Sequence, residues 1–203
     1  MEIRTKILEA ALQVFSETGY RGATTRRIAQ VADVNEVTLF RHFGSKEELM
    51  RAAVHFAAAE EELPRLPEAP LDAYAELSEW AEQHYRRMRS RSAMIRACMG
   101  ESCEHPDMAS YMCEGPKRIS ADLRTYIKKL EEQGLVNGAV DISAAIAMLM
   151  SALFADAINR DLMPGIYTYS DGEAPSRYVG VVLRALGVVP VVPVTRARTR
   201  RAN

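Results

Sequence analysis

The chain has 203 residues, of which 48% are hydrophobic and 26% are charged, and its net charge is −1 at neutral pH. This composition supports a buried core in one large or two small domains, and it excludes a generally basic nucleic-acid coat protein. Charged residues interrupt any apolar run at the N-terminus, and three irregularly spaced cysteines suit a reducing compartment. The longest apolar stretch, Ala144–Ala155, is too short to span a bilayer. We therefore expect a cytoplasmic protein.

Three helical patterns separated by turns come first along the chain. The first is expected over Thr5–Thr18, the second follows Thr25, and the third runs from Glu36 to about Phe43. Residues that favour the start of a helix stand before the later patterns: Thr24, Thr25, Asn35 and Ser45. In the third helix the apolar Leu39 and Phe43 lie four residues apart on the inner face, so polar side chains are left on the outer face.

Two short helices joined by a tight turn are typical of a helix-turn-helix, which presents its second helix to the major groove of DNA. Between Arg21 and Lys46 there are five basic residues against two acidic ones, a local balance of +3. Neutralisation of phosphates is the main source of nonspecific affinity for DNA, so the positive charges lie where such a motif needs them. The alternative interpretation is a small helical bundle without a role in nucleic-acid binding.

The same segment, with the helix before it, resembles the N-terminal DNA-binding domain of the TetR family of bacterial repressors. The matching residues agree with the family in order and spacing: Ala10, Ala11, Phe15, Gly19, Tyr20, Thr24, Thr25, Ile28, Ala29, Val34, Thr38, Leu39, Phe40, His42, Phe43, Ser45, Lys46 and Glu47. Three positions depart from the family pattern. Asp33 replaces the usual glycine of the turn, Val37 replaces a small residue, and Phe40 replaces a frequent phosphate-contacting tyrosine.

The resemblance implies an all-α protein with an N-terminal three-helix helix-turn-helix domain over residues 1–46. The residues expected to contact DNA lie at helix starts or on the outer face of the third helix: Thr25, Arg26, Arg27, Asn35, Glu36, Val37, Thr38, Phe40, Arg41, His42 and Lys46. We expect Arg41 and Thr38 to govern base choice. Thr25 and Lys46 are expected to hold phosphates, because the N-terminus of a helix is its positive end.

Helical patterns continue through the rest of the chain. The first covers Lys46–Glu62, and a proline-rich hinge at Leu63–Pro70 follows it. The later helical patterns are Asp72–Met88, Ser92–Ser102, Asp107–Gln133 with an interruption near Gly115-Pro116, Asp141–Leu162 and Pro175–Leu186. By resemblance, residues 47–188 form a C-terminal helical ligand-binding, regulatory and dimerisation domain. Residues 189–203 contain two prolines and four arginines without apolar partners, so a disordered basic tail is expected there.

The last two helical patterns have the composition of an interface. Asp141–Leu162 is apolar nearly all round and rich in alanine, so it is buried on several sides and allows close helix approach. Together with Pro175–Leu186 from each subunit it would form a four-helix interface in a symmetric homodimer. The alternative is that both helices only fill the core of the monomer.

The middle helices carry methionine, cysteine and aromatic residues at helical spacing. Methionine adapts to varied ligands, and an apolar cavity with a few polar groups is the usual form of a small-molecule site. The residues expected to line it are Trp80, His84, Tyr85, Met88, Met94, Cys98, Met108, Tyr111, Met112, Leu123 and Tyr126. For any one of these residues, plain core packing is the alternative.

Metal binding and catalysis are the two other kinds of chemistry that the residues of this chain would have to support. Cys98, Cys103, His105 and Cys113 lie close in sequence and suit a soft ion such as Cu(I), but their spacings match no metal motif. A metal- or thiol-sensing repressor is therefore an alternative, and we expect no metal and no cofactor. No catalytic motif is present, so we expect no catalytic residue and no enzyme.

These patterns together predict a homodimeric, ligand-responsive transcriptional repressor. It would bind a palindromic operator in double-stranded DNA, with no membrane partner, and a small apolar or aromatic effector would release it. The second interpretation is a nucleoid or structural DNA-binding protein without a ligand.

Overall fold

The computed structural model describes residues 2–59, 64–102, 106–136 and 140–188. Over these residues the chain is all-α, as the sequence predicts, and the described part contains no strand. The side chains of residues 58–59, 101–102 and 106–114 and the predicted tail at 189–203 lie outside the described part. The helices are α1 (Ile3–Gly22), α2 (Thr25–Val31), α3 (Glu36–Phe43), α4 (Lys46–Ala59), α5 (Ala73–Ser90), α6 (Ser92–Ser102), α7 (Pro106–Glu132), α8 (Ile142–Asn159) and α9 (Ala174–Ala185).

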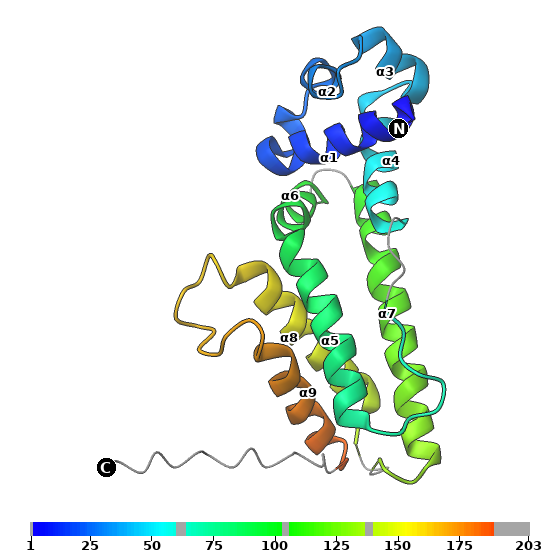
Figure 1. Ribbon diagram of the computed structural model, residues 1–203, viewed down its shortest axis with the longest axis vertical. Helices are drawn as coiled ribbons and strands as arrows, with labels where there is room; N and C mark the ends of the chain where they lie inside the picture. Colours follow the sequence, from blue (N-terminus) through cyan, green and yellow to red (C-terminus); the bar gives the residue numbers. More distant parts are fainter. Residues whose placement is uncertain (1, 60–63, 103–105, 137–139, 189–203) are drawn as a thin grey trace, which may run out of the picture.

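The first four helices share one hydrophobic cluster at one end of the molecule (Figure 1). We call it the N-terminal cluster; among its members are Val14, Phe15, Ile28, Leu39, Leu49 and Met50. In the turn between α2 and α3, Asp33 has φ of 53°, the left-handed conformation that glycine adopts more readily. Asn35 then begins α3, because its side chain accepts a hydrogen bond of 2.9 Å from the backbone N–H of Val37.

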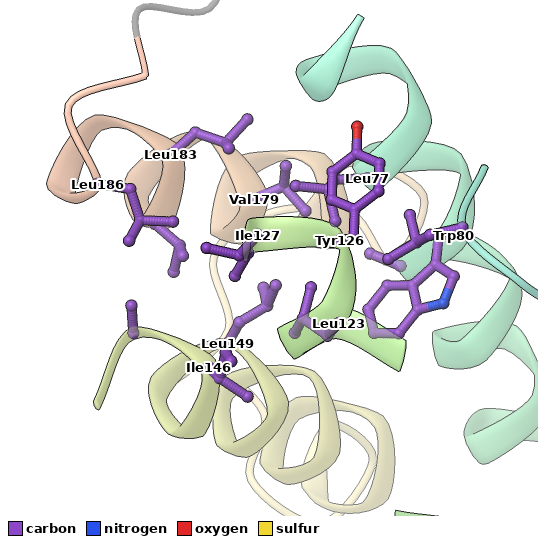
Figure 2. Close-up of a cluster of buried hydrophobic side chains, with 14 of the residues drawn as sticks. Leu77, Trp80, Leu123, Tyr126, Ile127, Ile146, Leu149, Val179, Leu183 and Leu186 are labelled. Atoms are coloured by element: carbon purple, nitrogen blue, oxygen red, sulfur yellow. The ribbon is translucent and has the colours of Figure 1, made fainter. Parts of the chain in front are cut away.

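A second cluster, the C-terminal cluster, joins α5, α7, α8 and α9. Figure 2 shows its centre: Leu77 and Trp80 of α5, Leu123, Tyr126 and Ile127 of α7, Ile146 and Leu149 of α8, and Val179, Leu183 and Leu186, which belong to or follow α9. By length and composition alone, α8 would be able to cross a membrane. Its Leu149 and Leu153 are buried in the C-terminal cluster, so this face of α8 serves the protein core.

Helix α6 connects the two clusters. Its Cys98 is buried in the N-terminal cluster, whereas Arg96 Nη1 donates to the Ile158 carbonyl at the end of α8, at 2.5 Å. Just before α6, Arg91 Nη1 donates to the Ala57 carbonyl of α4 at 2.7 Å. Helix α6 and the preceding Arg91 therefore link the end of α8 to α1 and α4.

Several helix boundaries differ from those that the sequence predicts. α1 runs from Ile3 to Gly22 instead of Thr5–Thr18, although the backbone of Gly19, with φ of 67°, is not helical. α7 runs from Pro106 to Glu132 without the interruption expected at Gly115-Pro116. Pro116 is exposed, so solvent can hydrate the carbonyl that the proline leaves unpaired. α8 ends at Asn159 instead of near Leu162, where the chain turns and the backbone N–H groups of Leu162 and Met163 both donate to the Asn159 carbonyl.

Candidate DNA-binding face and effector region

Helices α2 and α3 present an exposed face at the end of the molecule opposite α9 (Figure 1). The predicted DNA-contacting residues that are exposed there are Arg26, Arg27, Asn35, Val37, Phe40, Arg41 and His42. Val37 is 73% exposed and Phe40 is 43% exposed, so α3 holds two large apolar side chains in water. Beside Arg41, such side chains can contact thymine methyl groups while the guanidinium reads base edges in the major groove.

The remaining members of that set, Thr25, Glu36, Thr38 and Lys46, are half-buried. Thr25 Oγ1 donates to the Glu36 carboxylate at 2.5 Å and so ties the start of α2 to the start of α3. The Lys46 ammonium donates to the carbonyl of Tyr20 and lies 4.1 Å from the centre of its ring. Sequence reasoning assigned Thr25 and Lys46 to phosphates and did not reveal these partners, which are distant in sequence.

Comparison with known proteins identifies the family of this chain. Residues 7–53 match the family model described as bacterial regulatory proteins, tetR family. The chain is 28% identical over 155 residues to a protein named uncharacterized HTH-type transcriptional regulator YvkB from Bacillus subtilis, covering 76% of this chain and 81% of that protein. Residues 7–53 thus form a DNA-binding domain of the TetR family of bacterial transcriptional regulators, and the similarity to a transcriptional regulator extends over 76% of the chain.

Two further relatives agree with this assignment. The HTH-type transcriptional repressor AcnR of Corynebacterium efficiens is 28% identical over 144 residues, which are 70% of this chain and 64% of AcnR. The crystal structure of the TetR-family regulator PfmR from Thermus thermophilus superimposes with a TM-score of 0.67 over 89% of this chain and 98% of PfmR, at 24% identity, and so shares the fold. The chain is thus a DNA-binding transcriptional regulator and not an enzyme.

The residues predicted to line an effector pocket fall into three groups. Trp80, Tyr85, Leu123 and Tyr126 are buried in the C-terminal cluster, Met88 packs against it, and His84 is buried on the same helix as Trp80. Met94 and Cys98 lie elsewhere: they contact the N-terminal cluster, because α6 docks on α1. Met108, Tyr111 and Met112 belong to α7, but their side chains are outside the described part.

Part of the predicted hinge, around Pro64 and Leu66, is held against α5 and α7. The backbone N–H of Leu66 donates to Asp122 Oδ2 at 3.2 Å, and the His84 imidazole is hydrogen-bonded to the backbone of Pro64. Burial lowers the pKa of His84 to about 4, so its imidazole is neutral at physiological pH. Tyr126 donates to a Glu76 carboxylate, and burial together with this carboxylate raises the pKa of Tyr126.

Sequence reasoning missed a buried ionic network at the end of α8. Asp156 is 0% exposed and accepts hydrogen bonds from Arg160 Nε at 2.7 Å and from Arg160 Nη2 at 2.6 Å. It also accepts from the hydroxyls of Tyr85 on α5, at 3.1 Å, and Tyr178 on α9, at 2.5 Å. The spacing of Asp156 and Arg160, four residues apart, was the one available signal. Tyr85, which the sequence predicts at an effector pocket, belongs to this network, which links α5, α8 and α9.

Two hollows in the described part lie away from Trp80. One of about 300 Å³ is formed between α1 and the start of α6, and one of about 570 Å³ lies beside Arg89 and Asp161. Among the described residues no three His, Cys, Asp or Glu side chains are grouped to hold a metal ion. Of the residues in the soft-metal alternative, Cys98 is buried, whereas Cys103, His105 and the side chain of Cys113 lie outside the described part.

Proposed function

We propose that this regulator is a homodimeric repressor of a palindromic operator, acting in the cytoplasm, and that a small apolar or aromatic effector binding beside Trp80 releases it. The main support is that the two clusters carry different features. The N-terminal cluster carries an exposed, basic face, and the C-terminal cluster buries aromatic side chains with incompletely paired polar atoms. Because Leu49 and Met50 belong to the N-terminal cluster, we extend the DNA-binding domain from residues 1–46 through α4, and the effector and dimerisation domain follows up to residue 188.

On the DNA side, each subunit lays α3 into the major groove. Arg41 reads a base, Val37 and Phe40 supply apolar contacts, and Thr38 lies between them on the half-buried side. The other predicted residues on α2 and at the helix starts contact the backbone or hold these side chains. Two subunits related by a two-fold axis would read half-sites about 34 Å apart, so the operator is palindromic.

The dimer would use the faces of α8 and α9 that the C-terminal cluster leaves uncovered. These exposed side chains are small or apolar: Ala144, Ala147, Met148, Ser151 and Val181. The opposite faces of the same helices are buried in the monomer core. The two interpretations of these helices, core and interface, therefore apply to different faces.

Effector binding is coupled to DNA through the contacts that flank the C-terminal cluster. A ligand beside Trp80 requires side chains of this closely packed cluster to separate, which displaces α5 relative to α8. Arg96 and the hinge segment at Pro64 carry such a displacement to α6 and towards α4. The ligand shifts the equilibrium only by its differential affinity for the two forms.

The DNA part of the proposal is tested by mapping the sites that the regulator occupies on genomic DNA. A repressor should protect a few palindromic sites, and Arg41→Ala should weaken protection and make it less selective at one operator position while leaving the fold intact, because Arg41 is exposed. Uniform, sequence-independent coverage would instead support a nucleoid protein.

The effector part is tested with the emission of Trp80, the single tryptophan of the chain. Compounds from a library of small apolar and aromatic molecules should change this emission and release operator DNA over the same concentration range. Leu123→Ala, next to Trp80, should shift both midpoints, whereas the equally buried Leu186→Ala, at the far side of the cluster, should shift neither (Figure 2). Release without any change at Trp80 would contradict the proposal.

A further inference from the structure

Three buried polar atoms of α5 have no hydrogen-bond partner within the described residues, and two of them, Trp80 Nε1 and His84 Nε2, belong to rings that touch. The two side chains are 3% and 4% exposed and lie one helical turn apart. Their rings meet edge to face, with centroids 4.5 Å apart. Native structures pair nearly all buried donors and acceptors, so an orphaned pair in contact points to a missing partner.

The chemistry of each atom is fixed by its surroundings. Pro64 has no backbone N–H, so its hydrogen bond with the His84 ring goes from an imidazole N–H to the Pro64 carbonyl. Because Nε2 has no partner, the tautomer that fits the Pro64 contact carries its proton on Nδ1, and in that neutral ring Nε2 is an acceptor. The indole Nε1–H of Trp80 is only a donor. One of the two touching rings thus offers an unpaired donor and the other an unpaired acceptor.

Charged ligand groups do not complement this pair. A carboxylate would accept from Trp80 but has no proton for His84, and it would lie near the carboxylate of Asp122, which acts on the same imidazole. An ammonium would donate to His84 but cannot accept from Trp80. Either charge would also be desolvated beside the apolar Leu77 and Leu123.

A hydroxyl donates and accepts through one oxygen, which suits two rings that already touch. We propose that the effector of this regulator is a neutral hydroxyl compound, an alcohol or phenol with an apolar body, whose oxygen accepts from Trp80 Nε1 and donates to His84 Nε2. This inference rests on the proposed effector response. The apolar body would lie against the side chains of the C-terminal cluster that surround Trp80 (Figure 2).

The test uses the full chain labelled with ¹⁵N, in which Trp80 gives the single indole N–H resonance. Three probes of matched shape are titrated: 4-propylphenol, 4-propylanisole and 4-propylbenzoate. The phenol should move the indole proton downfield and bind at least about tenfold more tightly than the other two, since only it satisfies both atoms. His84→Phe should bring phenol and ether to equal affinity. Ser78→Ala, which removes another unpaired hydroxyl from α5, should keep the preference.

Equal affinity of the unchanged chain for phenol and ether, or binding of none of the three, would overturn the inference. So would an indole proton that is already hydrogen-bonded without ligand and unmoved by the phenol, because a permanent buried water would then be the partner. If the ether releases operator DNA as well as the phenol does, the effector response stands and only the hydroxyl requirement fails. If compounds that bind at Trp80 never release DNA, the proposed function itself fails.

Discussion

Replacing Arg160 with methionine should destabilise the folded regulator by about 3–5 kcal/mol. Asp156 is 0% exposed, and Arg160 supplies two of the four hydrogen bonds that its carboxylate accepts. After the change, the carboxylate keeps only the hydroxyls of Tyr85 and Tyr178 and loses its compensating charge. Breaking a buried ion pair is costly because the remaining charge stays desolvated without its partner.

A combined variant separates the electrostatic effect from packing. Adding Asp156→Leu, Tyr85→Phe and Tyr178→Phe to Arg160→Met removes every side chain that is charged or hydrogen-bonds within the network. This variant should recover most of the lost stability, because apolar side chains of similar volume replace a buried ion pair at little net cost. Asp156→Leu as a single change should destabilise the protein, because Arg160 and the hydroxyls of Tyr85 and Tyr178 would then lose their acceptor.

Arg177→Met is the matched control. Arg177 lies 3.8 Å from Glu173 in an ion pair whose two side chains are more than half exposed, so its loss should cost less than about 1 kcal/mol. Urea unfolding followed by circular dichroism, at one fixed protein concentration, gives the free energies. If Arg160→Met lost no more stability than Arg177→Met, or if the combined variant were as unstable as Arg160→Met, the network would not have the role assigned to it.

Three further outcomes are expected. Burial holds the pKa of His84 at about 4, so the free energy of unfolding should fall between pH 6.5 and pH 4 by up to roughly 3 kcal/mol, and urea titrations of His84→Gln should lack this component. Val181 is 53% exposed and Val182 is 7% exposed, so in sedimentation and circular dichroism Val181→Glu should give a folded monomer and Val182→Glu an unfolded chain; a stable Val181→Glu dimer would exclude this interface. In binding assays at several salt concentrations, Arg41→Ala should relax one operator position at a cost of about 1–3 kcal/mol. Arg26→Ala should weaken all sequences alike and lower the salt slope by roughly 0.9, and unequal losses would contradict this.

The helix starts could be predicted from the sequence because capping is local chemistry. Thr24, Asn35 and Ser45 each accept a hydrogen bond from a backbone N–H two or three residues later, and Asp141 does the same before α8. Asp33 adopts the left-handed conformation at the turn position where the family usually has glycine. The all-α fold and the family therefore follow from short-range patterns of caps and apolar spacing.

The helices, the fold class and the helix-turn-helix of this regulator can be predicted from the sequence, because they depend on residues a few positions apart. Only the tertiary structure assigned Val182 to the core and Val181 to the surface, and separated Cys98 from Trp80, because helix α6 docks on α1. The partners of Asp156 could not be predicted from sequence patterns either, because Tyr85 is 71 residues away. Periodicity tells which face of a helix is apolar, but it does not tell which distant helix covers that face. The unpaired atoms beside Trp80 likewise emerge only when every neighbour in the fold is known.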